Sequence, residues 1–114
     1  MKVHLEECGR AIKVKREALY TEFVDEASRL YGDALGHQQD DTAELVKLFA
    51  LLGRIRLASP RPVVTAAEWT FDTIVAAYLA PNRTIHEVLD DVRREGFNFL
   101  IEFGEACRQD LAPD

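Results

Sequence analysis

The stretch "AELVKLFALLGRIRL", residues Ala43–Leu57, is the most apolar part of this chain and decides how the other segments must be arranged. Its uninterrupted apolar run covers only Leu48–Gly53, with Lys47 before it and Arg54 after it. A membrane-spanning helix needs about 20 mostly apolar residues. The stretch is therefore too short and too charged to span a bilayer, and it indicates an amphipathic or buried helix.

This segment is apolar around most of a helical circumference. We expect the helix to begin near Asp41, because Asp41 followed three residues later by Glu44 is an acidic variant of the capping box. Its main apolar face consists of Leu45, Leu48, Phe49, Leu52 and Ile55. The residues that extend this face around one side are Val46, Ala50, Gly53 and Leu57. The narrow stripe left for solvent consists of Glu44, Lys47, Leu51 and Arg54. A helix covered on most sides is central to a bundle, so we expect this one in the core.

Two long amphipathic segments flank it in the sequence. The first runs from about Leu5 to Leu35, and its apolar face consists of Ile12, Leu19, Phe23, Ala27, Leu30 and Ala34. The next has Ser59 as its N-cap and Pro60 as its first helical residue, and it runs to about Ala80. Its core face consists of Val64, Ala67, Phe71, Ile74, Val75 and Tyr78. Both segments therefore have one side to bury against other helices.

A short helix and a last helix complete the chain. Thr84 with Glu87 forms a second capping box that opens the short helix, and Asn98 caps the last helix, which runs to about Asp110. No segment shows sustained period-two alternation, so we expect no sheet. Long amphipathic helices with short connections favour antiparallel neighbours. The sequence predicts an all-α fold, an up-and-down bundle of four main helices plus one short helix, in a single domain spanning residues 1–114.

Composition and charge narrow the class of protein. The 114 residues suit one domain, and 47% hydrophobic with 30% charged residues indicates a globular chain. The net charge of −6 disfavours nucleic acid as a partner, because nucleic-acid affinity comes largely from neutralising phosphates with Lys and Arg. The same charge makes a membrane partner unlikely. Cys8 and Cys107 are read as reduced thiols, with a disulfide between them left open, and with no secretory signal we expect a cytoplasmic protein.

The segment after Pro60 has a second face that is small and nearly uncharged. Away from its core face it carries the residues that we predict as an interface, Ala66, Trp69, Thr70, Thr73, Ala76 and Ala77. A small surface lets another helix approach closely, and Trp is a typical interface anchor. The alternative is that the last helix of the same chain covers this face. We predict either intramolecular packing here or contact with a second copy or another protein.

Two arginines, Arg16 and Arg56, lie within apolar stripes. A charge that leaves water must be paired, so we predict a partly buried structural ion pair between Arg56 and either Glu68 or Asp72. The alternative is that both arginines extend to solvent at helix ends. A third reading is an anion pocket between helices, lined by Arg16, Arg56, Tyr20, Tyr31 and Tyr78.

The remaining polar patterns are weak indicators of chemistry. The basic run "RAIKVKRE", from Arg10 to Glu17, is read as a solvated helix face, with contact to lipid or phosphate as the alternative. His86 and Asp90 lie one helical turn apart, which is at most half of a metal site, so we expect no metal. Phosphate-binding glycine loops, nucleophile elbows and cysteine–histidine arrangements are absent from the sequence. We therefore expect no cofactor and no enzymatic activity.

Four segments resemble a group of uncharacterised bacterial all-helical proteins. They are "EASRLYGDAL", "ELVKLFALLGRIRLASP", "IVAAYLAPN" and "EFGEACRQDL", in this order. The resemblance covers roughly Arg16 to Leu111, and "RIRLASP" and "YLAPN" are not generic helix sequence. It implies a helical fold and a bacterial origin, and it brings no activity and no catalytic residue. Some similar proteins carry a membrane segment ahead of the first helix, which would fall close to the basic run.

Together these features favour a non-catalytic helical module for protein–protein interaction or self-association, such as a homodimer. The alternative is a sensor of a small ligand or anion that binds in a pocket between helices.

Overall fold

The computed structural model describes residues 2–36, 43, 45–79, 85–94 and 98–113. Its helices in these ranges are α1 (Lys2–Gly36), α2 (Leu45–Ala58), α3 (Arg61–Leu79), α4 (Ile85–Arg94) and α5 (Asn98–Leu111). None of the described residues lies in a strand, which confirms the predicted all-α class. The two capping boxes begin at Asp41 and Thr84, which lie outside the described residues.

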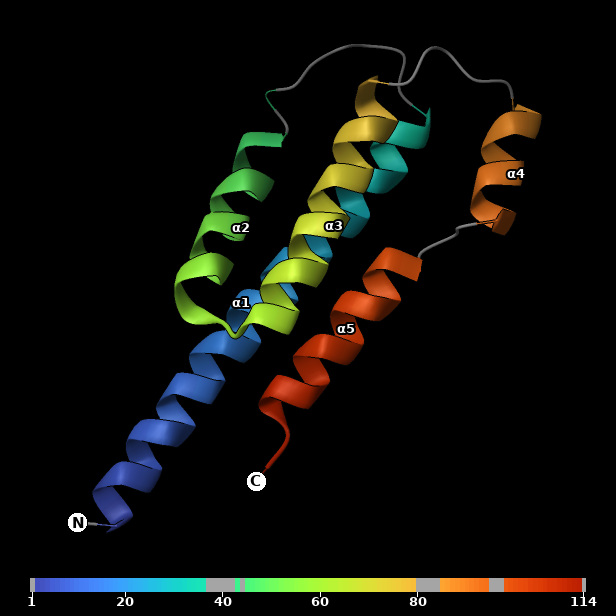
Figure 1. The fold of residues 1–114 in the computed structure, drawn as a ribbon. Coiled ribbons are helices and arrows are strands. Elements are labelled where there is room, and N and C mark those ends of the chain that lie inside the picture. Colours follow the sequence, from blue (N-terminus) through green and yellow to red (C-terminus); the bar gives the residue numbers. More distant parts are fainter. Residues whose placement is uncertain (1, 37–42, 44, 80–84, 95–97, 114) are drawn as a thin grey trace.

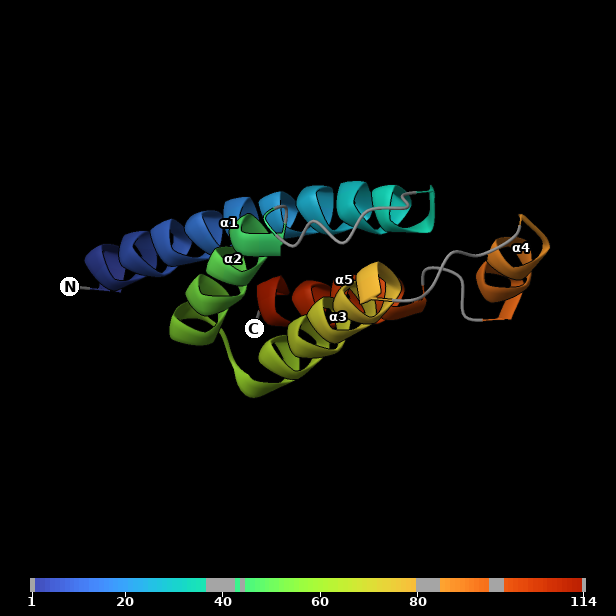
Figure 2. The same cartoon turned by 90° about the horizontal axis from the view of Figure 1, so that it is seen from above.

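Four of the helices form an up-and-down bundle. Figure 1 shows α1 and α3 running in one direction and α2 and α5 returning in the other. The helix α3 packs against α1, α2 and α5, whereas α2 packs against α1 and α3. The short helix α4 stands apart from the other four in both views (Figures 1 and 2). The bundle predicted from the sequence is thus present, but α1 and α3 each pack against three helices, whereas α2 packs against two.

The core is built from the inward faces of α1, α2, α3 and α5. The largest fully buried side chains are Phe23, Leu30, Leu48, Leu52, Ile55, Val63, Thr70, Ile74 and Phe103. Phe103 of α5 connects two helices, because its ring lies 4.8 Å from the ring of Phe23 and 6.0 Å from that of Tyr20, both on α1. Burying aromatic rings against each other stabilises the α1–α5 contact beyond the area they remove from water.

The predicted orientation of α2 was wrong in one respect. Leu51, assigned to the solvent stripe, is buried, whereas Val46, Phe49 and Leu57 are exposed. The reason is that α2 has only two neighbouring helices, so it can bury one arc of its circumference and not the wide arc that its apolar residues occupy. This segment therefore has one side in the core and another side exposed at the surface of the bundle.

The first helix extends past its neighbours. At about 1.5 Å per residue its 35 residues span about 52 Å, while the whole molecule measures 60 × 27 × 18 Å. Figure 1 shows the N-terminal part of α1 projecting beyond the turn between α2 and α3. Ile12 is exposed, so its predicted place in the core was wrong: it lines a surface pocket with Arg54, Leu57 and Ala58 at the C-terminal end of α2 and is not enclosed between helices.

The helix α3 begins one residue later than predicted. The amide of Ser59 donates to the carbonyl of Ile55 at 3.0 Å, which closes α2. The carbonyl of Pro60 accepts from the amide of Val64 at 3.2 Å, so Pro60 is the N-cap residue and Arg61 the first helical residue. The side chain of Ser59 is thereby free for a different role at this end of the bundle.

Candidate functional site

A polar cluster joins α1, α5 and the turn after α2 at one end of the bundle. Asp110 of α5 lies at its centre, with only 9% of its side chain exposed. Its carboxylate accepts from the Tyr20 hydroxyl at 2.7 Å and from Nη1 of Arg16 at 3.3 Å. The Tyr20 hydroxyl is also 2.8 Å from the Ser59 hydroxyl, which is therefore the new role of that side chain. Lys13 donates from Nζ to the carbonyl of Ala112 at 3.2 Å, close to the C-terminal end of α5.

The electrostatics of this cluster favour a neutral tyrosine. Burial, followed by the hydrogen bond to Asp110, raises the pKa of Tyr20 to about 12, and the hydrogen bond with Ser59 acts in the opposite direction. A hydroxyl has one proton to donate, so Tyr20 donates to the carboxylate of Asp110 and the Ser59 hydroxyl supplies the proton of the other bond. The cluster satisfies a buried charge and holds the end of α5 against α1, which is a structural role.

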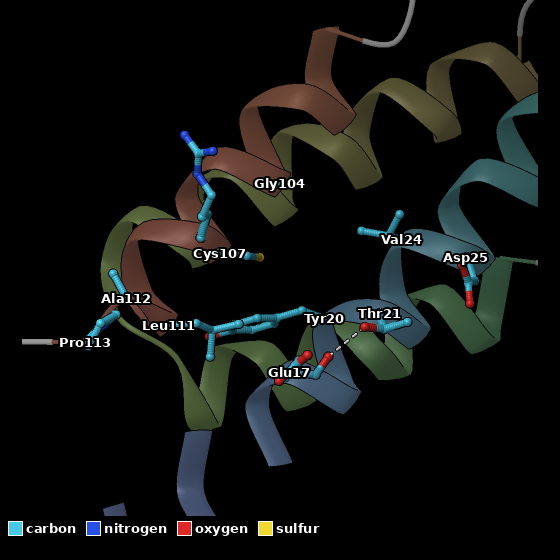
Figure 3. Close-up of a pocket in the computed structure, with 11 residues that line it drawn as sticks. Glu17, Tyr20, Thr21, Val24, Asp25, Gly104, Cys107, Leu111, Ala112 and Pro113 are labelled. Atoms are coloured by element: carbon cyan, nitrogen blue, oxygen red, sulfur yellow. Dashed lines mark hydrogen bonds between the residues drawn. The ribbon is translucent and has the colours of Figure 1, made fainter. Parts of the chain in front are cut away.

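Next to this cluster a groove of about 640 Å³ runs between α1 and α5. Its walls are formed by Glu17, Tyr20, Thr21, Val24, Asp25, Gly104, Cys107, Arg108, Leu111, Ala112 and Pro113. Figure 3 shows the side chains of Val24 and Cys107 pointing toward one another across it. Burial, followed by the charge of Asp110, raises the pKa of Cys107 to about 12. The thiol is thus protonated at neutral pH and is an apolar part of the wall rather than a nucleophile.

The predicted ion pair of Arg56 lies at the surface. Nη2 of Arg56 is 2.9 Å from Oε2 of Glu68 on α3, and the two side chains remain 45% and 38% exposed. The predicted pairing of Arg56 with Glu68 is thus present, with each side chain partly exposed at the edge of the α2–α3 contact. Asp72, the other candidate partner, is exposed on α3.

The five residues of the predicted anion pocket do not come together. Arg16 and Tyr20 meet at Asp110, whereas Tyr78 donates to Oδ2 of Asp33 at 2.6 Å and Tyr31 packs against Phe99 with ring centroids 4.9 Å apart.

Fifteen residues of helix separate Arg16 from Tyr31, a distance of about 22 Å. Arg56 is directed at Glu68 on α3. The prediction of one shared pocket was therefore wrong, because both arginines bind a carboxylate of the chain itself.

The second face of α3 is divided between the core and the surface. Thr70 is fully buried, and its hydroxyl lies 2.9 Å from the carbonyl of Ala66 and 3.5 Å from that of Phe99 on α5. Ala66 and Ala77 pack partly buried against the core. At Thr70 the last helix of the same chain covers this face, as the alternative expected, so Thr70 takes part in an intramolecular contact and is not accessible to a partner. Trp69 and Ala76 stay exposed, and Thr73 is half-buried with its hydroxyl donating to the carbonyl of Trp69 at 2.8 Å.

The outer side of α2 is a surface that the sequence reasoning assigned to the core. Val46 is 67%, Phe49 55% and Leu57 91% exposed, and between them lie Ala50, which is exposed, and Gly53, which is half-buried. We call these five residues the α2 face. The ring of Phe49 lies 5.7 Å from that of Phe71 on α3, which extends the apolar surface across the α2–α3 contact.

Three ion pairs flank the α2 face. On the side of α1, Lys47 lies 3.7 Å from Glu26 and Arg54 lies 3.6 Å from Glu22. The third pair, on the side of α3, is that of Arg56 with Glu68. A signal for this face was present in the sequence, because positions 46, 50, 53 and 57 follow the four–three–four spacing of a helix-packing seam.

Other candidate features carry little chemistry in the described residues. His86 and Asp90 are exposed on α4, and within the described ranges no three His, Cys, Asp or Glu side chains are grouped so that they could hold a metal ion. Among the described helices, none combines the length and the apolar character needed to cross a bilayer. Cys107 is a free cysteine.

Comparisons of the chain with protein-family models, with curated proteins and with solved structures found no match.

Proposed function

We propose that this chain is a single-domain, non-catalytic helical interaction module, and that the α2 face is the surface by which it binds another protein surface. The observation that carries the proposal is the exposure of Val46, Phe49 and Leu57 on one side of α2, with no charged residue among the five positions of the face.

The free energy available from covering this face supports the proposal. Burying an aliphatic or aromatic side chain completely is worth roughly 1.5–3 kcal/mol relative to leaving it in water. Three large side chains of the α2 face are more than half exposed, so a partner that covers them gains several such contributions. An aromatic residue beside aliphatic ones is also the usual composition of the centre of an interface.

The cellular setting that fits this module is the cytoplasm. The buried Cys107 is a free thiol, as is usual in a reducing compartment. We therefore propose a cytoplasmic binding partner, either another protein or a second copy of the chain.

Site-specific photo-crosslinking tests the docking role. A photoreactive amino acid placed at Leu57 in cells that make the chain at its natural level is expected to give a covalent protein adduct. The same group at Ile101 is the matched control, because Ile101 is a large exposed aliphatic residue on α5, away from the α2 face. The photoreactive group is also placed at Phe49. Equal adducts at Leu57 and Ile101, or no adduct at either Leu57 or Phe49, would reject the α2 face as a docking surface.

A second candidate function rests on the groove between α1 and α5. Its volume of about 640 Å³ lies within the range of small-molecule pockets, and its floor is apolar. Glu17 and Asp25 at its α1 wall have no ion-pair partner among the described residues, so the groove favours a cation with an apolar body over the anion expected from the sequence. Thermal-shift measurements with hydrophobic amines and with phosphates separate the two, since a ligand that binds only the native state raises the melting temperature.

A further inference from the structure

We infer that the partner at the α2 face is a second copy of this chain, with the two α2 helices packed antiparallel and closest to each other at Ala50 and Gly53. This inference rests on the proposed function and adds the identity of the partner.

Gly53 is a half-buried glycine in the interior of α2. A Cβ atom added at this position meets nothing within 4 Å, so no neighbouring group of the same chain requires a glycine there. Glycine in a helix interior destabilises the helix relative to alanine because it loses more backbone freedom on folding. A helix that approaches from outside gives the missing reason, since small residues allow two helix backbones to come close together.

The shape of the face suits an antiparallel copy. The face has large side chains at its two ends, Val46 and Leu57, and small residues, Ala50 and Gly53, between them. Antiparallel packing about a two-fold axis between positions 50 and 53 sets Val46 against Leu57 of the second copy and Ala50 against its Gly53. Such a contact is self-complementary, as an interface between identical chains must be, and it opposes the two helix dipoles.

The charge balance of the surface favours a copy over a charged partner. The chain carries a net charge of −6, so two copies repel over most orientations. The α2 face is flanked by three cations, Lys47, Arg54 and Arg56, and each is within 4 Å of a glutamate of its own chain. The face and its flanks therefore have no net charge. Two copies do not repel each other at this surface, and a strongly charged partner finds no opposite charge here to bind.

The exposed area is compatible with such a dimer. The chain exposes 7804 Å². A compact protein of 12.9 kDa is expected to expose about 6,300 Å², so the chain exposes roughly 1,500 Å² more. The projecting part of α1 and the separate helix α4 account for a share of this excess. A standard interface buries about 800 Å² on each partner, which is roughly half of this excess area.

The test compares Gly53→Leu with Gly32→Leu by analytical ultracentrifugation of the purified full chain. Gly32 is the matched control, because it is also a helical glycine around which an added Cβ meets nothing within 4 Å, and it lies on α1. We expect the wild type and Gly32→Leu to sediment as dimers. Gly53→Leu is expected to keep or raise the melting temperature of the monomer, since leucine forms helices better than glycine, and to raise the dimer dissociation constant roughly tenfold or more.

The orientation is tested by mixing Val46→Cys with Leu57→Cys chains under oxidising conditions. Antiparallel packing predicts a disulfide between position 46 of one chain and position 57 of the other, identified by mass spectrometry, whereas parallel packing predicts linkage between identical positions and would overturn the orientation. Dimers of equal strength in Gly53→Leu and wild type, or a wild type that stays monomeric at high concentration, would overturn the inference. A monomeric wild type that still gives a photo-adduct to a different protein at Leu57 would overturn the second copy as the partner and leave the proposed function standing. A wild type that neither dimerises nor gives a photo-adduct at the α2 face would overturn both the inference and the proposed function.

Discussion

Raising the pH from 7 to 11 is expected to lower the stability of this protein substantially through one buried thiol. Cys107 lies in the wall between α1 and α5 and is almost fully buried. Burial and the nearby carboxylate of Asp110 raise its pKa from an ordinary 9.0 to about 12. The folded state therefore holds a proton that the unfolded chain has already lost at moderately alkaline pH.

The sign and size of the effect follow from this difference. The folded-state pKa is above the unfolded value, so the stabilisation is fully present below pH 9 and is lost as the pH rises toward 12. Each pKa unit is worth 1.36 kcal/mol, so three units amount to about 4 kcal/mol, of which about 3 kcal/mol is lost by pH 11. A domain of this size has about 5–15 kcal/mol of stability in total, so the loss is a large fraction of it.

The assay is urea denaturation of the wild type and Cys107→Ala at several values between pH 7 and pH 11. At pH 7 the variant is expected to be less stable by about 1 kcal/mol, because a buried sulfur atom is lost. At pH 11 it is expected to be the more stable protein. Other groups, including Tyr20, titrate in both proteins and largely cancel in the difference. Two stability curves that stay parallel across this range would refute the assigned burial and pKa of Cys107.

Three further substitutions test the description of the bundle. Phe103→Ala is expected to lower the free energy of unfolding, measured by urea denaturation, by about 3–5 kcal/mol, because it removes a fully buried ring that contacts Tyr20 and Phe23. The control Ile101→Ala, on the exposed side of α5, should change it by less than about 0.5 kcal/mol. The hydrogen bond from Arg29 lowers the pKa of Glu26 below 4.5 in the folded protein. The ionised Glu26 therefore stabilises the fold above pH 4.5, and this stabilisation is lost as the pH falls through the folded-state pKa. Glu26→Gln should accordingly make the free energy of unfolding depend less on pH in the acid range. Arg56→Ala should cost less than about 1 kcal/mol by thermal denaturation, since its ion pair with Glu68 is solvent-exposed, and a loss of 3 kcal/mol or more would contradict that placement.

Several parts of the candidate sites could not be inferred before the helices were placed. Asp110 looked like an ordinary polar residue at the end of the last helix, and only the packing of α5 against α1 brings it to Tyr20 and Arg16. The groove beside it depends equally on the distance between two helices. Contacts between residues about 90 positions apart leave no local pattern in a sequence, because local periodicity reports which side of a helix is buried and not which helix covers it.

The sequence by itself determined the number and type of the long elements. Periodic apolar positions such as Leu19, Phe23 and Leu30 require a helix with one buried side, and the residues around Pro60 require a break between two helices, because these effects act within a few residues. Only the tertiary structure decided which part of a broad apolar arc is covered. In α2 that arc was wider than two neighbouring helices can bury, so Leu51 turned inward and Phe49 and Leu57 were left in water. The number of neighbours a helix has is a property of the whole bundle, and this is why the surface that we propose for binding became visible only in three dimensions.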